Sequence, residues 1–492
     1  MEKLVYLFYP MALLLLLFGS KWYGRKQWNE EAFSLGQSKA WQGFFAAMIM
    51  LHHVGQKTCA SWLDRRWPRM PGLELFVPIG YYFVAFFLLC SGFGLYKSWK
   101  KKENYLQGFV KKRVLPLVIT FFVTDWVFIL VRLALGEKMN LTKVIYYITG
   151  IQQPNPNAWF VIALPIFYLM FYLCFRLIKR EGWALFGTSL LVLVWVLIGC
   201  ATDHNDYWFR GEWWYNSALF FPLGLLFAKW EGKIVPHLKK YYLLYLVGTA
   251  AAVWGLYRCS VLAEGQFGYY CEWLPSLWGR IGRRFVTAMA QHGAAGAFVL
   301  FVYLVGLKVK IGNRALKFMS AITLEFYLVH GLFVELFAVL YLFAQQTGEA
   351  YSRMVMLLTG VFYVVLSYIA RIIWKYVLKN IRRVGKRSLL MVCSRENAEK
   401  TIRNIQDNNY GMYQISGLVL MEEGFVGTEI GGIPVVADAG NVSAYAQKNW
   451  VDEVFVNLPE NAPLPHRLMD DFVEMGVTVH MNLSQVTHVP GR

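Results

Sequence analysis

The stretch WQGFFAAMIMLHHVGQK (residues 41–57) is long and apolar enough to cross a bilayer as a helix, yet it contains two adjacent histidines. A helix separates neighbouring side chains by about 100°. His53 therefore shares a face with Gln42, which lies about 16 Å away along the axis. His52 instead shares a face with the bulky side chains of Trp41, Phe45 and Met48. The sequence predicts that His53 faces a helix-bundle interior and that His52 packs among large residues.

Apolar runs long enough to span a membrane recur along the chain up to residue 378. Of the 492 residues, 57% are apolar and only 16% are charged, whereas soluble domains carry about 25% charged residues. We therefore predict a polytopic α-helical membrane protein with about 11 spans. The expected spans are residues 3–19, 41–57, 76–97, 115–135, 157–178, 184–200, 216–230, 240–257, 290–308, 319–343 and 353–378.

The formal charge of +18 is unevenly distributed. Residues 386–492 carry 8 Lys and Arg against 13 Asp and Glu, so the remaining 385 residues carry a net charge of +23. Basic residues follow every odd-numbered span, which predicts that those loops and the C-terminal domain lie in the cytoplasm. The same excess fits contact with anionic lipid in the bilayer. No basic stripe with interleaved aromatics occurs in the C-terminal part, so nucleic acid is not an expected partner.

Two groups of arginines run against this pattern. Residues 65–69 and 280–284 each contain three arginines in expected exterior loops. An anionic partner would explain them. Cys259 and Cys271 share the second of these loops and could form a disulfide if it faces an oxidising compartment. No Cys-x-x-Cys occurs, and no metal site is expected.

The pattern changes after Arg387. Short apolar runs alternate with helical segments, as in a parallel α/β sheet. The expected strands include SLLMVCS (388–394), YQISGLVLM (413–421), IPVVAD (433–438), DEVFVNL (452–458) and VTVHMNL (477–483), and the expected helices are 395–408, 441–450 and 465–475.

Few ionisable residues lie at membrane depth besides the histidine pair. They are Asp125, Glu325 and His330, with Arg132 and Glu335 nearer the span ends. Such groups suit general acid–base chemistry, a proton relay in a transporter, or hydrogen bonding between helices. Lys111, Lys112 and Arg113 form a basic cluster at the expected inner surface. That cluster fits a phosphate-rich ligand, or topology alone.

Five segments, taken in order, resemble the bacterial integral-membrane acyltransferase family 3, which O-acylates surface polysaccharides and related envelope molecules. They are QGFFAAMIMLHH (42–53), FFLLCSGFGLY (86–96), GFVKKRVLP (108–116), AWFVIALPIFY (158–168) and LEFYLVH (324–330). The resemblance covers residues 38–345. It implies transfer of an acyl group, with acetyl the first expectation, from acyl-CoA to a hydroxyl of a polysaccharide or lipid-linked glycan at the bacterial cytoplasmic membrane. Acyl-CoA would be a cosubstrate, and no permanently bound cofactor is implied.

The resemblance also assigns site residues. His53 takes the position of the essential histidine, as general base or in an acyl relay, about 20 Å or less from the inner end of its span. Gln42 stands where the family has a basic residue, and Lys39 could substitute. Asp125 or Glu325 would orient His53, with His330 accessory. Lys111, Lys112 and Arg113 would bind the phosphates of acyl-CoA. Motif positions with an expected structural role are Ser91, Gly92, Phe93 and Trp159.

The sequence predicts four regions along the chain. Residues 1–24 would be an extra N-terminal helix, and 38–345 the acyltransferase core. Residues 346–385 would be the last span and a basic linker. Residues 386–492 resemble the Rossmann-like domain of polyprenyl glycosylphosphotransferases. The turn at 393–396 lacks the glycines that bring backbone amides to a phosphate, and no transferase domain of that family follows. We therefore expect this domain to bind polysaccharide-assembly proteins, to regulate the core, or to be a remnant of a gene fusion, with nucleotide binding left open.

Two alternatives use the same residues. One is a transporter or flippase for a lipid-linked glycan, with the intramembrane polar groups along its path. The other is a membrane scaffold for exopolysaccharide assembly, in which the C-terminal domain binds partners.

Overall fold

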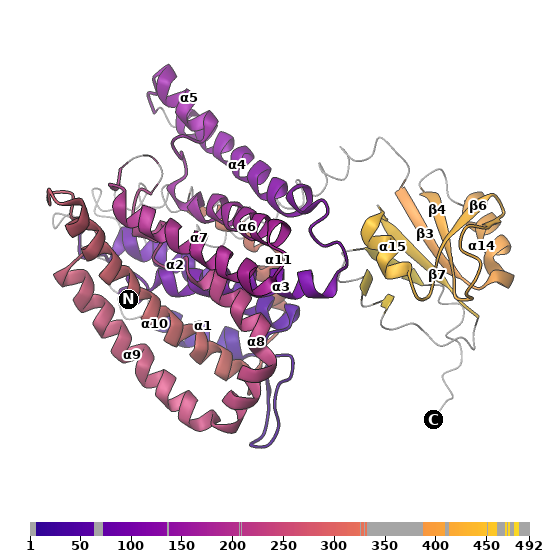
Figure 1. The fold of residues 1–492 in the computed structure, drawn as a ribbon, viewed down its shortest axis with the longest axis horizontal. Coiled ribbons are helices and arrows are strands. Elements are labelled where there is room, and N and C mark those ends of the chain that lie inside the picture. Colours follow the sequence, from indigo (N-terminus) through magenta and orange to yellow (C-terminus); the bar gives the residue numbers. More distant parts are fainter. Residues whose placement is uncertain are drawn as a thin grey trace. The chain divides into compact units, whose positions relative to one another are not determined.

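The computed structural model describes residues 6–62, 72–134, 137–205, 207, 209–324, 326–328, 330–331, 387–408, 413–449, 451–459, 468–469, 471–472 and 477–481. The chain divides into two compact units, Met1–Arg371 and Ile372–Arg492 (Figure 1). The described part of the first unit is almost entirely helical, and the second contains a β-sheet.

Helices dominate the first unit. They are α1 (Phe8–Leu17), α2 (Leu35–Thr58), α3 (Gly80–Lys101), α4 (Leu115–Ala134), α5 (Leu141–Thr149), α6 (Trp159–Leu177), α7 (Glu181–Ala201), α8 (Phe220–Lys240), α9 (Tyr242–Gln266), α10 (Leu277–Gly306) and α11 (Arg314–Ala321). A π-helical segment, Val110–Val114, leads into α4. Five described helices have the length and hydropathy of membrane spans: Val110–Leu133, Trp159–Leu177, Glu181–Ala201, Tyr242–Gln266 and Leu277–Gly306. A helical membrane unit is confirmed, whereas the number of eleven spans stays a prediction. Most of the expected tenth span and all of the eleventh lie outside the described residues.

Polar side chains start several helices earlier than hydropathy predicts. Ser34 caps α2 by accepting a hydrogen bond from the Gln37 amide. The helix therefore starts at Leu35, six residues before the expected span. Ser276 caps α10 in the same way, well before residue 290. These caps satisfy amides that a helix start leaves without partners. The apolar runs therefore marked only the membrane-embedded parts of longer helices.

The basic loops lie together at one end of the bundle. Strand β1 (Lys21–Trp22), after α1, pairs with β2 (Val309–Lys310), after α10. Lys239 at the end of α8 donates to the carboxylate of Glu30, at 2.6 Å. Segments that follow three different odd-numbered spans are thus in direct contact.

Glu181 extends this end of the bundle, hereafter the basic end. Its carboxylate, at the start of α7, accepts from Lys100 of α3 at 2.6 Å and lies 3.3 Å from Lys229 of α8. The described loops that follow odd-numbered expected spans therefore lie at the same end of the bundle. The side of the membrane that they face stays a prediction.

Arginines that we expected in an exterior loop are instead part of α10, so that expectation is wrong. Arg284 is fully buried and donates to the backbone oxygens of Tyr269, Cys200 and Thr202, and to the Glu272 carboxylate at 2.6 Å. Arg280 pairs with Asp203 at 2.7 Å. These bonds tie the α7–α8 and α9–α10 connections together at the end opposite the basic end. A structural role, and not a free anionic partner, accounts for these charges. Arg65, Arg66 and Arg69 lie outside the described residues.

The disulfide that Cys259 and Cys271 could have formed is absent. Both are free thiols: Cys259 is exposed on α9, whereas Cys271 is buried. The Cys271 thiol lies 3.7 Å from the backbone oxygen of Tyr269. Sharing a connection in sequence did not bring the two sulfurs together.

Helices α3 and α8 pack with almost no space between their backbones. A methyl group at Gly92 would overlap the carbonyl oxygen of Phe221, and one at Gly224 would overlap that of Leu89. The adjacent ring of Phe93 packs edge-on against Phe33, 4.7 Å between centroids. Gly92 therefore allows a close helix–helix contact.

The second unit has the strand order of a Rossmann fold. Its described strands are β3 (Arg387–Cys393), β4 (Tyr413–Leu420), β5 (Glu429–Ile430), β6 (Ile433–Asp438), β7 (Glu453–Asn457) and β8 (Thr478–Met481), in the order β5-β6-β4-β3-β7-β8. All neighbours are parallel except β5 and β6. The five parallel strands follow the 3-2-1-4-5 order. The predicted α/β domain is confirmed, and the hairpin strand β5 is the element that we did not predict.

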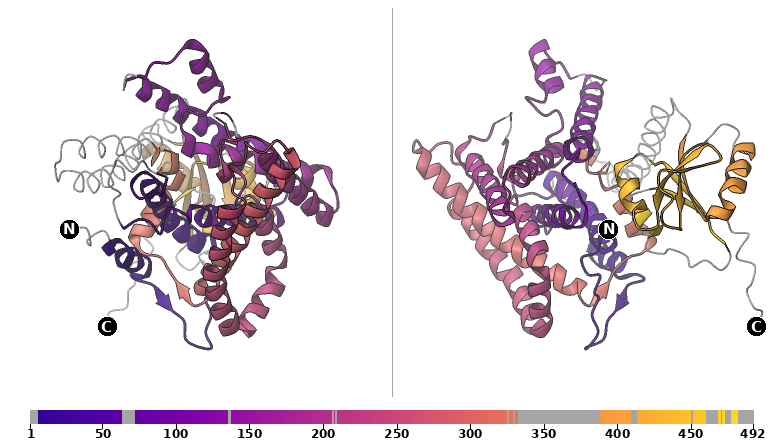
Figure 2. Two further views of the ribbon diagram at one scale, coloured as in Figure 1. Left: turned by 90° about the vertical axis from the view of Figure 1, so that its left-hand side faces the viewer. Right: turned by 45° about the vertical axis from the view of Figure 1, so that its right-hand side comes forward.

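Side chains of β3 alternate between two cores. Leu390 and Val392 pack with residues of α15 (Val442–Lys448), whereas Met391 and Cys393 pack with α14 (Arg395–Asn408). Figure 2 shows the two helices on opposite faces of the sheet. This two-sided burial explains why the strand is a continuous apolar run.

We predict that Gly92→Ala destabilises the membrane unit by about 1–3 kcal/mol, because the new methyl group must push α8 away. Gly94→Ala is the matched control, because nothing lies within 4 Å of a methyl group there. Thermal unfolding of the purified full-length protein measures both. Equal stability of the two variants would contradict the close α3–α8 contact.

Candidate functional site

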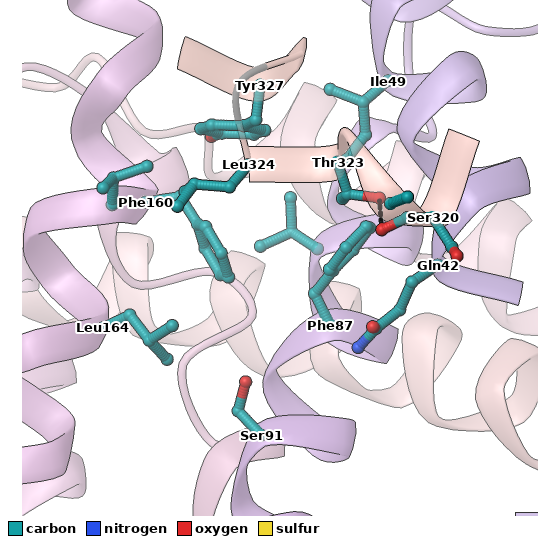
Figure 3. A pocket seen from close by; sticks show the side chains of 13 residues that line it. Gln42, Ile49, Phe87, Ser91, Phe160, Leu164, Ser320, Thr323, Leu324 and Tyr327 are labelled. Carbon is teal, nitrogen blue, oxygen red and sulfur yellow. Dashed lines mark hydrogen bonds between the residues drawn. The ribbon is translucent and has the colours of Figure 1, made fainter. Parts of the chain in front are cut away.

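A cavity of about 380 Å³ lies within the first unit. Helices α2, α3 and α6, with α11 and the residues just after it, form its walls. Its lining is mainly apolar and includes Ile49, Phe87, Phe160 and Leu164. Figure 3 shows Ser91 and Gln42 toward one side of the cavity and Tyr327 on the other. The cavity is thus an apolar chamber with polar groups at its edges.

His53 lies just beyond the cavity. Gln42 and Ile49 line the cavity from α2, and His53 follows Ile49 by about one helical turn on the same face. The rings of His53 and His330 are 4.9 Å apart, and His330 lies 5.4 Å from the ring of Tyr327, a lining residue. His53 and His330, two residues that the sequence analysis singled out separately, are therefore brought together at one edge of the chamber.

His53 lies farther from the basic end than its span suggested. Because α2 begins at Leu35, His53 is about 27 Å from the start of the helix and about 7 Å from its end at Thr58. The expected distance of 20 Å or less was counted from residue 41, where the apolar run begins, and it stays a prediction; the helix itself starts six residues earlier, in polar turns that hydropathy missed. A group bound at the basic end must therefore reach through most of the bundle to meet this histidine.

Gln56 is the hydrogen-bond partner of His53. The Nδ1 atom of His53 is 3.1 Å from the Gln56 side-chain oxygen, which can only accept a hydrogen bond. With the amide in this orientation, a neutral ring carries its proton on Nδ1 and its lone pair on Nε2. Gln56 was predicted to lie on this face of α2, but no role was predicted for it. Its spacing of three residues from His53 is the signal that indicates the contact.

His52 makes different contacts. Its Nδ1 donates to the Phe76 carbonyl at 2.9 Å, in the connection before α3. Its ring lies directly against Gly80, where a methyl group would overlap it. His52 thus joins the end of α2 to the start of α3.

His330 is positioned by one ring nitrogen and by its neighbouring backbone. Its Nδ1 donates to the Tyr327 carbonyl, and its Nε2 is buried without a hydrogen-bond partner among the described residues. Asn155, just before α6, donates to the Leu328 carbonyl at 2.9 Å. A methyl group at Gly331 would overlap the Asn155 side chain. The connection that precedes Trp159 therefore positions His330, while Trp159 itself is buried at the start of α6.

Other predicted residues are not brought to His53. Asp125 is fully buried in α4, and neither carboxylate oxygen has a hydrogen-bond partner in the described part of the chain. Lys39 is exposed on α2 and does not line the cavity. Glu325 lies outside the described residues. Among the predicted orienting groups, only His330 has a described contact with His53.

The basic cluster lies near the other side of the cavity. Lys111, Lys112 and Arg113 are exposed on the π-helical segment before α4. The hydroxyl of Tyr168, on α6, lies near both Arg113 and the Ser91 side chain. Ser91 lines the cavity. Arg113 and this side of the chamber therefore share Tyr168 as a neighbour.

Comparison with known families identifies the membrane unit. Residues 38–378, more than two thirds of the chain, match the family described as "Acyltransferase domain". The chain belongs to this acyltransferase family. Residues 310–472 match a second family, described as "CoA-binding domain". The predicted acyltransferase with a fused Rossmann-like domain is confirmed. No curated protein and no solved structure matches the chain.

The turn after β3 does not fit the phosphates of CoA. A Rossmann fold binds phosphate at this turn with glycines and the amides of the following helix. Here the Arg395 amide donates to the Glu422 carboxylate, which occupies the start of α14. Burial, with the nearby charge of Glu422, raises the pKa of the Cys393 thiol to about 12. The anion position is thus filled by a carboxylate of the chain itself.

We predict that His52→Ala lowers stability by about 1–3 kcal/mol, because it empties the contact with Gly80 and leaves the Phe76 carbonyl without its donor. His53→Ala should cost about 1 kcal/mol or less, since it loses one hydrogen bond within its own helix. Thermal unfolding of both variants measures the difference. A larger loss in His53→Ala would contradict the structural role of His52.

Proposed function

We propose that this membrane acyltransferase moves an acyl group from acyl-CoA, with acetyl-CoA the simplest donor, to a hydroxyl of a cell-surface polysaccharide or lipid-linked glycan. The observation that carries the proposal is the position of His53. Its ring lies at the edge of an apolar chamber with Nδ1 hydrogen-bonded to Gln56, and Arg113 of the basic cluster lies near Tyr168, beside the lining residue Ser91. Inner-membrane location, with the basic end and second unit in the cytoplasm, is part of the proposal.

The donor would enter from the basic cluster. Lysine and arginine pair strongly with phosphate, so Lys111, Lys112 and Arg113 would hold the phosphates of CoA. The uncharged arm of CoA would pass Ser91 and occupy the chamber, whose walls are mainly apolar. The thioester would then lie near Tyr327 and the two histidines. This arrangement accounts for the distance between the basic end and His53.

His53 would act as the general base. Its Nε2 takes the proton of the acceptor hydroxyl while that oxygen attacks the thioester carbonyl. The carbon–sulfur bond breaks, the imidazolium gives its proton to the departing sulfur, and the products are an O-ester and free CoA. The Gln56 oxygen holds the Nδ1 proton throughout, which keeps the ring in one tautomer. His330 packs against the ring and positions it.

Family membership favours this enzyme over a transporter. The same buried polar groups were compatible with a translocation path, but the match over residues 38–378 is to an acyltransferase. The scaffold alternative applies to the second unit, where docking of polysaccharide-assembly proteins remains our proposal. The occupied turn at Arg395 supports a role other than phosphate binding.

We predict that His53→Ala lowers kcat for O-acylation at least about 100-fold, because general-base catalysis contributes roughly 10²–10⁴-fold. Transfer of radiolabelled acetyl from acetyl-CoA to glycan, in proteoliposomes at matched protein levels, measures it. His52→Ala is the control and should retain activity in proportion to its folded fraction. Full activity in His53→Ala would refute the assignment.

We predict that Lys111→Gln with Arg113→Gln raises the KM for acyl-CoA about tenfold or more, since charge-assisted bonds to phosphate are lost. Arg395→Gln, in the second unit, should leave KM unchanged because that turn is occupied by Glu422. The opposite pattern, with KM sensitive only to Arg395→Gln, would place the donor phosphates on the Rossmann-like domain.

A further inference from the structure

A second cavity, of about 760 Å³, lies at the basic end between α1 and the start of α11. It is separate from the chamber beside His53 and shares no lining residue with it. Asn313 fixes its geometry, because its side-chain amide donates to the carbonyls of Leu15 and Phe18 at 2.7 and 3.2 Å. The first turn of α11 is thereby held against the end of α1.

One wall of this cavity is apolar. Leu14, Leu15 and Phe18 line it, and Leu14 and Phe18 are 68% and 76% exposed. They continue the apolar surface of α1, which ends four residues before Lys21 in strand β1. The wall therefore lies where the hydrocarbon region would give way to the polar interface.

The opposite wall carries two cations. Arg314 and Lys317 line the cavity, both are exposed, and neither has an ion pair or hydrogen bond with any described side chain. Other lysines of the basic end are engaged within the protein. Lys239 pairs with Glu30, and Lys308 donates to three backbone carbonyls and lies 3.6 Å over the ring of Trp28. Arg314 and Lys317 thus present charge to the cavity.

We propose that this cavity binds an anionic phospholipid of the bilayer. The phosphate would lie between Arg314 and Lys317, and an acyl chain would run along Leu14, Leu15 and Phe18. Basic pockets beside membrane helices suit anionic headgroups, and the apolar wall suits the chain attached to one. A free phosphate would use only the cationic half of the cavity.

Binding here would act on the acyltransferase core through α11. The last turns of this helix supply Ser320 and Ala321 to the chamber beside His53, whereas its first turn holds the cations. Gly43 of α2 lies directly against the Ser320 backbone, so α11 has little freedom to shift. An anionic lipid would therefore stabilise this wall of the chamber.

The test measures binding of phosphatidylglycerol and phosphatidylcholine to the purified full-length protein by native mass spectrometry. We expect a preference for phosphatidylglycerol that falls about tenfold or more in the variant Arg314→Gln with Lys317→Gln, since both cations that would attract the anionic headgroup are removed. Arg25→Gln with Lys26→Gln is the matched control, because these cations follow α1 but do not line the cavity. Phe18→Ser should weaken the binding of both lipids, because both place an acyl chain along this wall.

Three results would overturn the proposal. They are equal binding of the two lipids, an equal loss in the control variant, and full competition by inorganic phosphate with no effect of Phe18→Ser. The readout is lipid binding and not acyl transfer, so it is independent of the proposed enzymatic activity.

Discussion

A bilayer interior offers no hydrogen-bond partners, and this constraint organises the whole first unit. A polar group at membrane depth is costly unless it finds a partner in the protein or lines a cavity. Arg284 meets the requirement with three carbonyls and one carboxylate. His53 meets it with Gln56 on one nitrogen only, beside the chamber. Because its bonds all go to other parts of the chain, we assign Arg284 a structural role. Because one nitrogen of His53 has no bond in the described part of the chain, we assign His53 a chemical role.

Close backbone packing makes the site possible. Helices α3 and α8 approach at Gly92 and Gly224. The same helix α3 supplies Phe87 and Ser91 to the chamber. A larger residue at Gly92 would push α8 away and shift that wall. The motif Ser91-Gly92-Phe93 thus combines a lining residue, a packing residue and a core aromatic in three consecutive positions.

The sequence predicted local features better than tertiary ones. Strands β3 to β8, apart from the short β5, follow apolar runs whose periodicity is visible directly, and they were predicted nearly to the residue. The starts of α2 and α10 were missed because serine caps and paired arginines lower hydropathy without ending a helix. The contact between His53 and His330 joins distant parts of the chain, and it was not predicted: the sequence pointed to each histidine but left the partner of His53 open. Spacing alone could have suggested Gln56.

Mass spectrometry of the surface glycan tests most directly whether the protein transfers an acyl group to a glycan hydroxyl. Cells that produce the protein should carry alkali-labile acyl esters on the glycan, and cells that lack it should carry the same glycan without them. An unchanged set of esters, together with a loss of the glycan from the surface, would contradict the account and favour transport.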